Sequence, residues 1–169
     1  MRVPVSRAAL LLLTLAAAEP LGSARFRAVT LEPGQRKHFR VEHIEKVTAA
    51  SGRCVEEGMD VDEPQTFWLE ASCGGVRTTL AWRKDGSRVH VMACAEDDTR
   101  TQALVKRRQK VQGELKPFKA VTACVRHGTV ELWGWALTPT EFEQVQALAR
   151  KLGDDQVTNK VELLSEDER

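Results

Sequence analysis

Four cysteines are the residues whose chemistry this sequence constrains most: Cys54, Cys73, Cys94 and Cys124. They could bind zinc, act as thiol nucleophiles or pair as disulfides. Zinc sites usually use closely spaced pairs such as C-x-x-C or H-x-x-x-H, and the sequence contains neither pattern. An even cysteine count in a chain with an export signal favours two disulfides, so we expect no metal site.

The sequence leaves three disulfide pairings open, because four cysteines can pair in three ways. We favour Cys54–Cys73 with Cys94–Cys124. The first bond would cross-link one domain, and the second would join that domain to the next.

Residues that could serve acid–base or nucleophilic catalysis are scattered along the chain. His38, His43, His90 and His127 lie mostly on predicted strands beside arginine or glutamate, which favours a structural role. No serine lies in a nucleophile-elbow motif, and no glycine-rich phosphate loop is present. We therefore predict no catalytic residues, no cofactor and no small-molecule substrate, and the protein is expected not to be an enzyme.

Trp133 and Trp135 are candidates for binding a protein partner. Side chains alternate along a strand, so these tryptophans would face away from Val130, Leu132 and Ala136. Two predicted helices need the apolar face, which leaves the tryptophans on the other side of the sheet. That side is either a partner-binding patch or is covered by another part of the same chain.

One predicted helix carries a basic face formed by Arg100, Lys106, Arg107, Arg108 and Lys110. Such a face could contact an anionic membrane, since each basic residue near anionic headgroups contributes about 1 kcal/mol. A solvated helix face is the alternative, because no bulky apolar residues flank the charges. The formal net charge is only +1, which gives no reason to expect a nucleic-acid partner.

The N-terminal residues 1–24 have the pattern of a secretory signal peptide. Arg2 and Arg7 precede an uncharged apolar run over residues 8–18, which is shorter than the ~20 residues that a spanning helix needs. Cleavage is expected after Ala18 or Ala24. No cysteine lies near these sites, so we expect a soluble mature protein in the periplasm or associated with the envelope, without a lipid anchor.

Two domains are expected after the signal peptide. Residues 25–96 should form a small all-β domain, because alternating segments are separated by turn signals, with an Asp85-Gly86 hairpin near its end. Residues 97–164 should form a helix, two strands, a second helix and a last strand, with two helices on one sheet face. Residues 165–169 form an acidic tail. The expected fold class is α+β.

The second half resembles a BON domain, a small α/β module of bacterial envelope proteins. The resemblance covers residues 98–164 and rests on His127-Gly128, Val130-x-Leu132-x-Gly134-x-Ala136, Ala147-Leu148-Ala149 and Val157-x-Asn159-x-Val161. Asp155-Gln156 stands where that family usually has glycine. The resemblance implies a three-stranded sheet with two helices on one face, and a phospholipid role has been attached to the family.

The first half resembles the N-terminal region of secretins of pilus and type II/III-like secretion systems. The similar stretches are Leu31-x-Pro33-Gly34-Gln35, Ile44-x-Lys46-Val47, Gly75-x-x-Thr78-Thr79-Leu80-x-Trp82 and Asp85-Gly86. The short loop 73–75 and the cysteines depart from that family. In secretins this region precedes a BON-like domain.

Together these features predict a non-enzymatic periplasmic interaction module, an accessory of a pilus or secretin-type secretion assembly. Its partner would be a secretin, a pilus component or another envelope protein. The alternative is a BON-type stress protein that binds phospholipid or the envelope surface.

Overall fold

The structure, a computed structural model, describes residues 17–153 and 156–169. In chain order the elements are β1 (Glu19–Pro20), β2 (Phe26–Leu31), β3 (Arg36–Arg40), β4 (Ile44–Gly52), β5 (Val55–Met59), β6 (Thr66–Ala71), β7 (Gly75–Arg83), β8 (Arg88–Ala95), α1 (Gln102–Glu114), β9 (Val121–Arg126), β10 (Thr129–Ala136), α2 (Pro139–Leu152), β11 (Val157–Leu163) and the 3-10 helix η1 (Glu166–Glu168).

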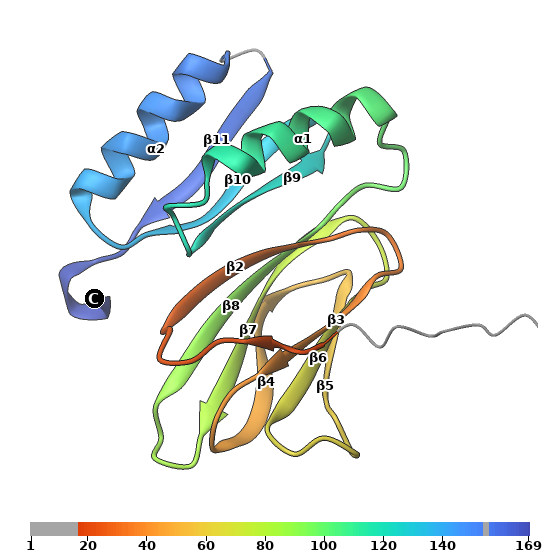
Figure 1. Cartoon of the computed structure of the whole chain (residues 1–169), viewed down its shortest axis with the longest axis vertical. Coiled ribbons are helices and arrows are strands. Elements are labelled where there is room, and N and C mark those ends of the chain that lie inside the picture. Colours follow the sequence, from red (N-terminus) through yellow and green to blue (C-terminus); the bar gives the residue numbers. More distant parts are fainter. Residues whose placement is uncertain (1–16, 154–155) are drawn as a thin grey trace, which may run out of the picture.

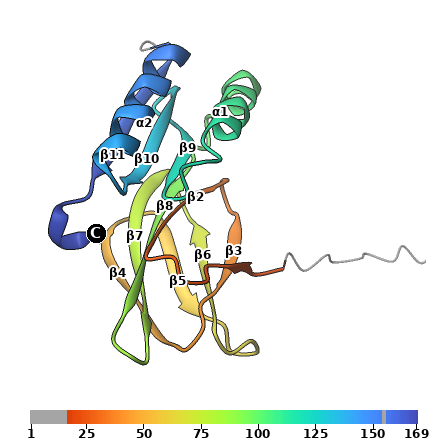
Figure 2. The ribbon, with the colours of Figure 1, turned by 60° about the vertical axis from the view of Figure 1, so that its left-hand side comes forward.

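The elements stack in four layers (Figure 1). The outermost sheet has the order β1-β3-β6-β5 and packs on the sheet β2-β8-β7-β4. The three-stranded sheet β11-β10-β9 lies on the other face of β2 and β8. Helices α1 and α2 cover its far side, and the turned view in Figure 2 shows the same order of layers.

The expected α+β fold, an all-β domain followed by a BON-like sandwich, was wrong. Within the described residues the protein is mostly β, with 47% strand against 20% helix, arranged as eleven strands in three sheets and two α-helices. The physical reason lies in the sheet β11-β10-β9, because both of its faces are covered. It is an inner layer of a β-rich body rather than a sheet with one open side.

The first core lies between the two four-stranded sheets. Phe39 and Phe67 are fully buried there and stack with their ring centroids 5.2 Å apart. Burying a side chain of this size contributes about 1.5–3 kcal/mol. The N-terminal segment enters the same core through Leu21, which is 5% exposed.

Local sequence signals explain how several elements begin and end. Gly86 adopts a positive φ in the β7–β8 turn, and the Asp85 carboxylate accepts hydrogen bonds from the backbone and hydroxyl of Ser87. At the start of α2, Thr138 accepts a hydrogen bond from the Glu141 backbone at 3.1 Å. The expected hairpin is therefore present, and Thr138 caps the N-terminus of α2.

The contact between the inner sheets depends on a glycine in β10. Gly134 has a φ of +131°, and a Cβ atom there would overlap the carbonyl oxygen of Ala120 and lie 3.0 Å from the Cβ of Ala28. The next residue, Trp135, donates its backbone N–H to that same carbonyl at 2.8 Å. Only glycine fits here without displacing Ala120, which directly precedes the neighbouring strand β9, and a side chain would also tighten the contact with Ala28 of β2.

Gly134→Ala should therefore destabilise the oxidised protein by at least about 2 kcal/mol, because it combines a strained φ with a backbone overlap. Gly113→Ala is the matched control, since Gly113 lies in α1 with open space where its Cβ would be. It should stabilise the protein by about 0.5–1 kcal/mol. Urea unfolding measures the free energy of unfolding of both variants. Equal changes in the two variants would contradict the close approach of Gly134 to Ala120 and Ala28.

The expected signal peptide lies mostly outside the described residues, but the region around the two cleavage sites is described. Glu19 pairs with Arg27 and, at 2.8 Å, with Lys37. Burial alone would raise the pKa of Glu19, but the hydrogen bond and charge of Lys37, together with Arg27, outweigh it and lower the pKa below 4.5. Cleavage after Ala24 would remove this carboxylate together with Leu21.

We therefore predict that the mature chain begins at Glu19, which N-terminal sequencing or intact mass would show. Glu19→Gln should lower stability at neutral pH, because a depressed folded-state pKa contributes stability above the unfolded pKa. The difference from the unmodified protein should disappear as the pH falls through the folded-state pKa of Glu19. A mature chain beginning at Arg25 would contradict the prediction.

Candidate binding surfaces

Both expected disulfides are present, in the pairing that we favoured. Cys54 and Cys73 lie 4.6 Å apart between their Cα atoms and join the start of β5 to the loop before β7. Cys94 and Cys124 are fully buried, 6.2 Å apart, and join β8 to β9 across two sheets. Two disulfides fit an exported protein. Among the described residues no helix is long and apolar enough to cross a membrane.

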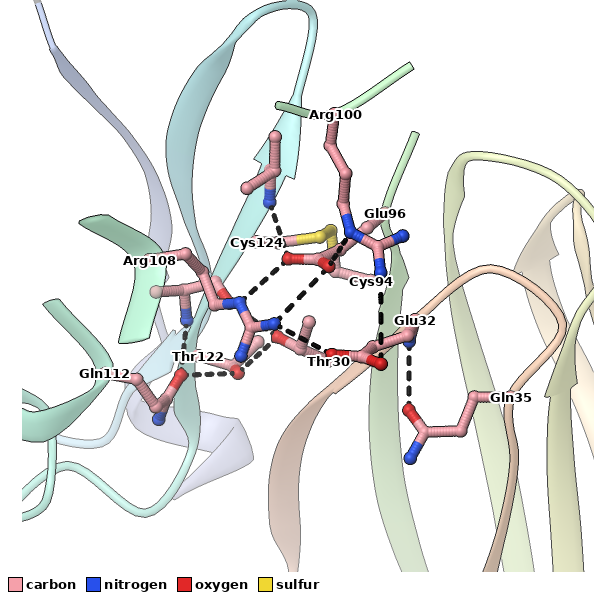
Figure 3. A network of polar contacts seen from close by, with 12 residues as sticks. Thr30, Glu32, Gln35, Cys94, Glu96, Arg100, Arg108, Gln112, Thr122 and Cys124 are labelled. Carbon is pink, nitrogen blue, oxygen red and sulfur yellow. Dashed lines mark hydrogen bonds and ion pairs between the residues drawn. A yellow bond between two sulfur atoms is a disulfide. The ribbon is translucent and has the colours of Figure 1, made fainter. Parts of the chain in front are cut away.

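A buried carboxylate lies beside the second disulfide (Figure 3). Glu96 is fully buried, accepts a hydrogen bond from the Val125 backbone at 3.2 Å, and pairs with Arg108 at 2.9 Å and Arg100 at 3.2 Å. Both arginines also approach the half-exposed Glu32. The cluster links the end of β8, the segment before α1, the middle of α1 and β9.

This cluster corrects the expected lipid-contacting face. Arg100 and Arg108 are only 20% and 13% exposed, and they neutralise Glu96 inside the protein rather than facing outward. Lys106, Arg107 and Lys110 remain exposed on α1. The expected face of five charges is therefore reduced to three, because the sequence alone did not show that Glu96 is buried next to the helix.

The tryptophan pair needs a similar correction. Trp135 is 7% exposed and packs edge-on against Phe26 of β2, with ring centroids 5.4 Å apart. Trp133 is half-buried, and its indole N–H donates to Glu131 at 2.7 Å. The same chain covers this side of the sheet, so Trp135 is an interior residue and not part of an open binding patch.

The uncovered part of the middle sheet carries aromatic and cationic side chains that sequence analysis did not single out. Trp82 of β7 lies opposite Arg88 of β8, whose guanidinium is 5.3 Å from the indole centroid. In the adjacent cross-strand row, Phe26 lies opposite His90 and their rings stack at 4.8 Å. These two rows form a continuous surface on β2, β8 and β7.

We call this surface the β7–β8 pocket, a cavity of about 570 Å³. Its lining residues are Arg25, Phe26, Trp82, Arg83, Gly86, Ser87, Arg88, His90, Asp167 and Glu168. Burial lowers the pKa of His90, and the charges of Arg88 and Arg25 lower it further, while Glu168 acts in the opposite direction. The charged residues of the lining are three arginines and the two acids Asp167 and Glu168.

The other histidines are placed singly. His38 lies 3.4 Å from Asp60, and His127 lies 3.1 Å from Glu131, in different sheets. No group of three or more His, Cys, Asp or Glu side chains within residues 17–153 and 156–169 is arranged to hold a metal ion.

No family model, no curated protein and no solved structure matches this chain. The functional proposal therefore depends on the surfaces described above.

Neutralising the buried acid should have a larger effect than neutralising its exposed neighbour. Glu96→Gln leaves two largely buried guanidinium groups without their main partner and should cost about 3 kcal/mol or more. Glu32→Gln removes a carboxylate that approaches the same two arginines but is 51% exposed, and should cost less than about 1 kcal/mol. Denaturant unfolding of both variants checks this, and a cost for Glu32→Gln as large as that for Glu96→Gln would contradict it.

Proposed function

We propose that this protein is an exported, non-enzymatic interaction module of a bacterial-type envelope, and that it binds another envelope protein through the β7–β8 pocket. The observation that carries the proposal is that Trp82, Arg83 and Arg88 line one pocket, in which Arg88 is exposed and Trp82 and Arg83 are half-buried. Arginine and tryptophan are the residue types that contribute most to binding energy at protein interfaces.

The scaffold around the pocket supports a binding role. Trp82 is held by a hydrogen bond from its indole N–H to Thr48 at 2.9 Å, and Lys46 lies over the ring at 5.5 Å. Arg83 donates to the Gly22 carbonyl at 3.0 Å. Side chains that are already positioned lose less conformational entropy when a partner binds, which favours affinity.

The choice of partner rests on the sequence resemblance. The stretch from Gly75 to Gly86 that resembles secretin N-terminal regions forms β7 and the following turn, so it contributes Trp82 and Arg83 to the pocket. A secretin or pilus component, and a periplasmic location, are therefore part of the proposal.

Photocrosslinking in the native cells tests the proposal. A crosslinking amino acid in place of Lys84, in the turn next to the pocket, should give a discrete adduct with a secretin, a pilus component or another envelope protein, identified by mass spectrometry. The same substitution at Gln144, exposed on α2, is the matched control and should not give that adduct. Equal adducts from both positions, or an adduct with a cytoplasmic protein alone, would contradict the proposal.

Binding to an anionic membrane is the competing function, supported by the exposed Lys106, Arg107 and Lys110 on α1. Flotation with vesicles containing anionic lipid distinguishes membrane binding from the proposed binding of an envelope protein. The proposal expects no more flotation than with neutral vesicles. Flotation that is lost on Arg107→Ala with Lys110→Ala would favour the membrane role instead.

A further inference from the structure

Arg88 is the pocket cation that forms no ion pair with an acid in the described part of the chain, and its guanidinium lies over Trp82. Arg83 also forms no ion pair there, donates to the Ser87 hydroxyl at 3.3 Å, and lies close enough to Asp85 for its charge to lower the pKa of that carboxyl. Arg25 donates to the backbone oxygen of Arg169 at 2.8 Å. Unpaired positive charge around a cavity favours an anionic ligand.

The acidic residues 165–169 lie along one side of this cavity. Leu164 is 4% exposed and packs in the core between the inner sheets, which fixes where the segment leaves β11. Arg25 donates a hydrogen bond to the Arg169 carbonyl at 2.8 Å, and Asp167 and Glu168 line the pocket. Figures 1 and 2 both show this end of the chain beside the junction of the layers.

The Glu168 carboxylate of this segment has a lowered pKa. The Ser165 hydroxyl, 2.7 Å away, and the Ser165 backbone N–H donate to Glu168 and lower its pKa, and His90 lies close enough to add to the effect. Yet Asp167 and Glu168 make no ion pair with the three arginines among the described residues. The segment therefore contacts the pocket through the bond from Arg25 to the Arg169 backbone oxygen, while its acidic side chains form no ion pair with Arg83 or Arg88.

We propose that the β7–β8 pocket binds an acidic linear peptide segment of the partner protein, and that residues 165–169 act as a weak intramolecular competitor for it. This inference rests on the proposed function. Charge complementarity supports the peptide, since a carboxylate-bearing segment of this chain already borders the cavity. Carboxylates are also natural partners for arginine because each can accept paired hydrogen bonds from a guanidinium group. The volume of about 570 Å³ lies in the usual range for ligand sites.

Fluorescence anisotropy with the oxidised mature protein tests the inference. The probe is a labelled peptide with the sequence of residues 163–169, compared with a counterpart in which its three acids are amides. The acidic peptide should bind more tightly, by at least about tenfold at low salt, and the difference should shrink as salt screens the charges.

Three variants locate the binding. Arg83→Ala with Arg88→Ala should weaken the acidic peptide by at least about tenfold. Arg107→Ala with Lys110→Ala removes the same charge from α1 and should change affinity by less than about twofold. Asp167→Asn with Glu168→Gln removes the competing charge and should strengthen binding by about three- to tenfold. Circular dichroism confirms that each variant is folded.

Several results would overturn the inference. They are equal binding of the two peptides, equal loss in the two cation variants, or no gain in the Asp167 and Glu168 variant. Tighter binding of a thymidine oligonucleotide or of anionic vesicles to the same arginines would assign the pocket to another ligand class. If the Lys84 adduct forms with an envelope protein but the acidic peptide does not bind, only this inference fails. If neither is seen, the proposed function fails as well.

Discussion

The buried carboxylate of Glu96 is the interaction on which the joining of the layers depends. A charged group that is fully buried costs several kcal/mol unless opposite charges and hydrogen bonds surround it. Arg100, Arg108 and the Val125 backbone supply these, and each comes from a different element. Helix α1 buries Val111 within its own length, and its polar contacts to the layers below come from Arg108 with Glu96 and from Gln112 with the Ala123 backbone at 2.8 Å. The neighbouring Cys94–Cys124 disulfide links the same two sheets covalently.

Once the layers are joined in this way, the middle sheet has a covered part and an open part. The strands β9 and β10 lie over β2 and β8 near Ala28 and Met92, and Gly134 allows the close approach there. Further along the same face, Trp82 and Arg88 are left on the surface. The pocket therefore results from the incomplete overlap of two sheets of different size, and the segment after β11 runs along its border.

Local sequence patterns were sufficient for the Asp85-Gly86 hairpin, which depends on neighbours in the chain, whereas the disulfide pairing was one of three that the sequence left open. They were not sufficient for the fold class, because strand alternation shows that a strand has two faces but not which sheet covers each face. Trp135 was misplaced for this reason, and Arg108 was misplaced because the sequence did not show that Glu96 is buried next to α1. The pairing of Trp82 with Arg88 in the pocket could be predicted from the sequence, because the two residues lie opposite each other across the predicted hairpin. Its other half needed the parallel pairing of Phe26 with His90, which are far apart in the sequence.

Charge distribution, rather than total charge, distinguishes the two basic regions of this protein. The net charge of +1 gives no long-range attraction to any anionic partner. Arg108 on α1 and Arg100 just before it are already paired with Glu96, so this region contributes less positive charge to the surface than its sequence suggests. At the β7–β8 pocket Arg83 and Arg88 form no ion pair within the described residues, and Arg88 lies over the Trp82 ring. At salt concentrations near 0.15 M, charges separated by more than about 8 Å are largely screened. A ligand must then contact these arginines directly, which favours a short segment that can enter the pocket over a broad charged surface.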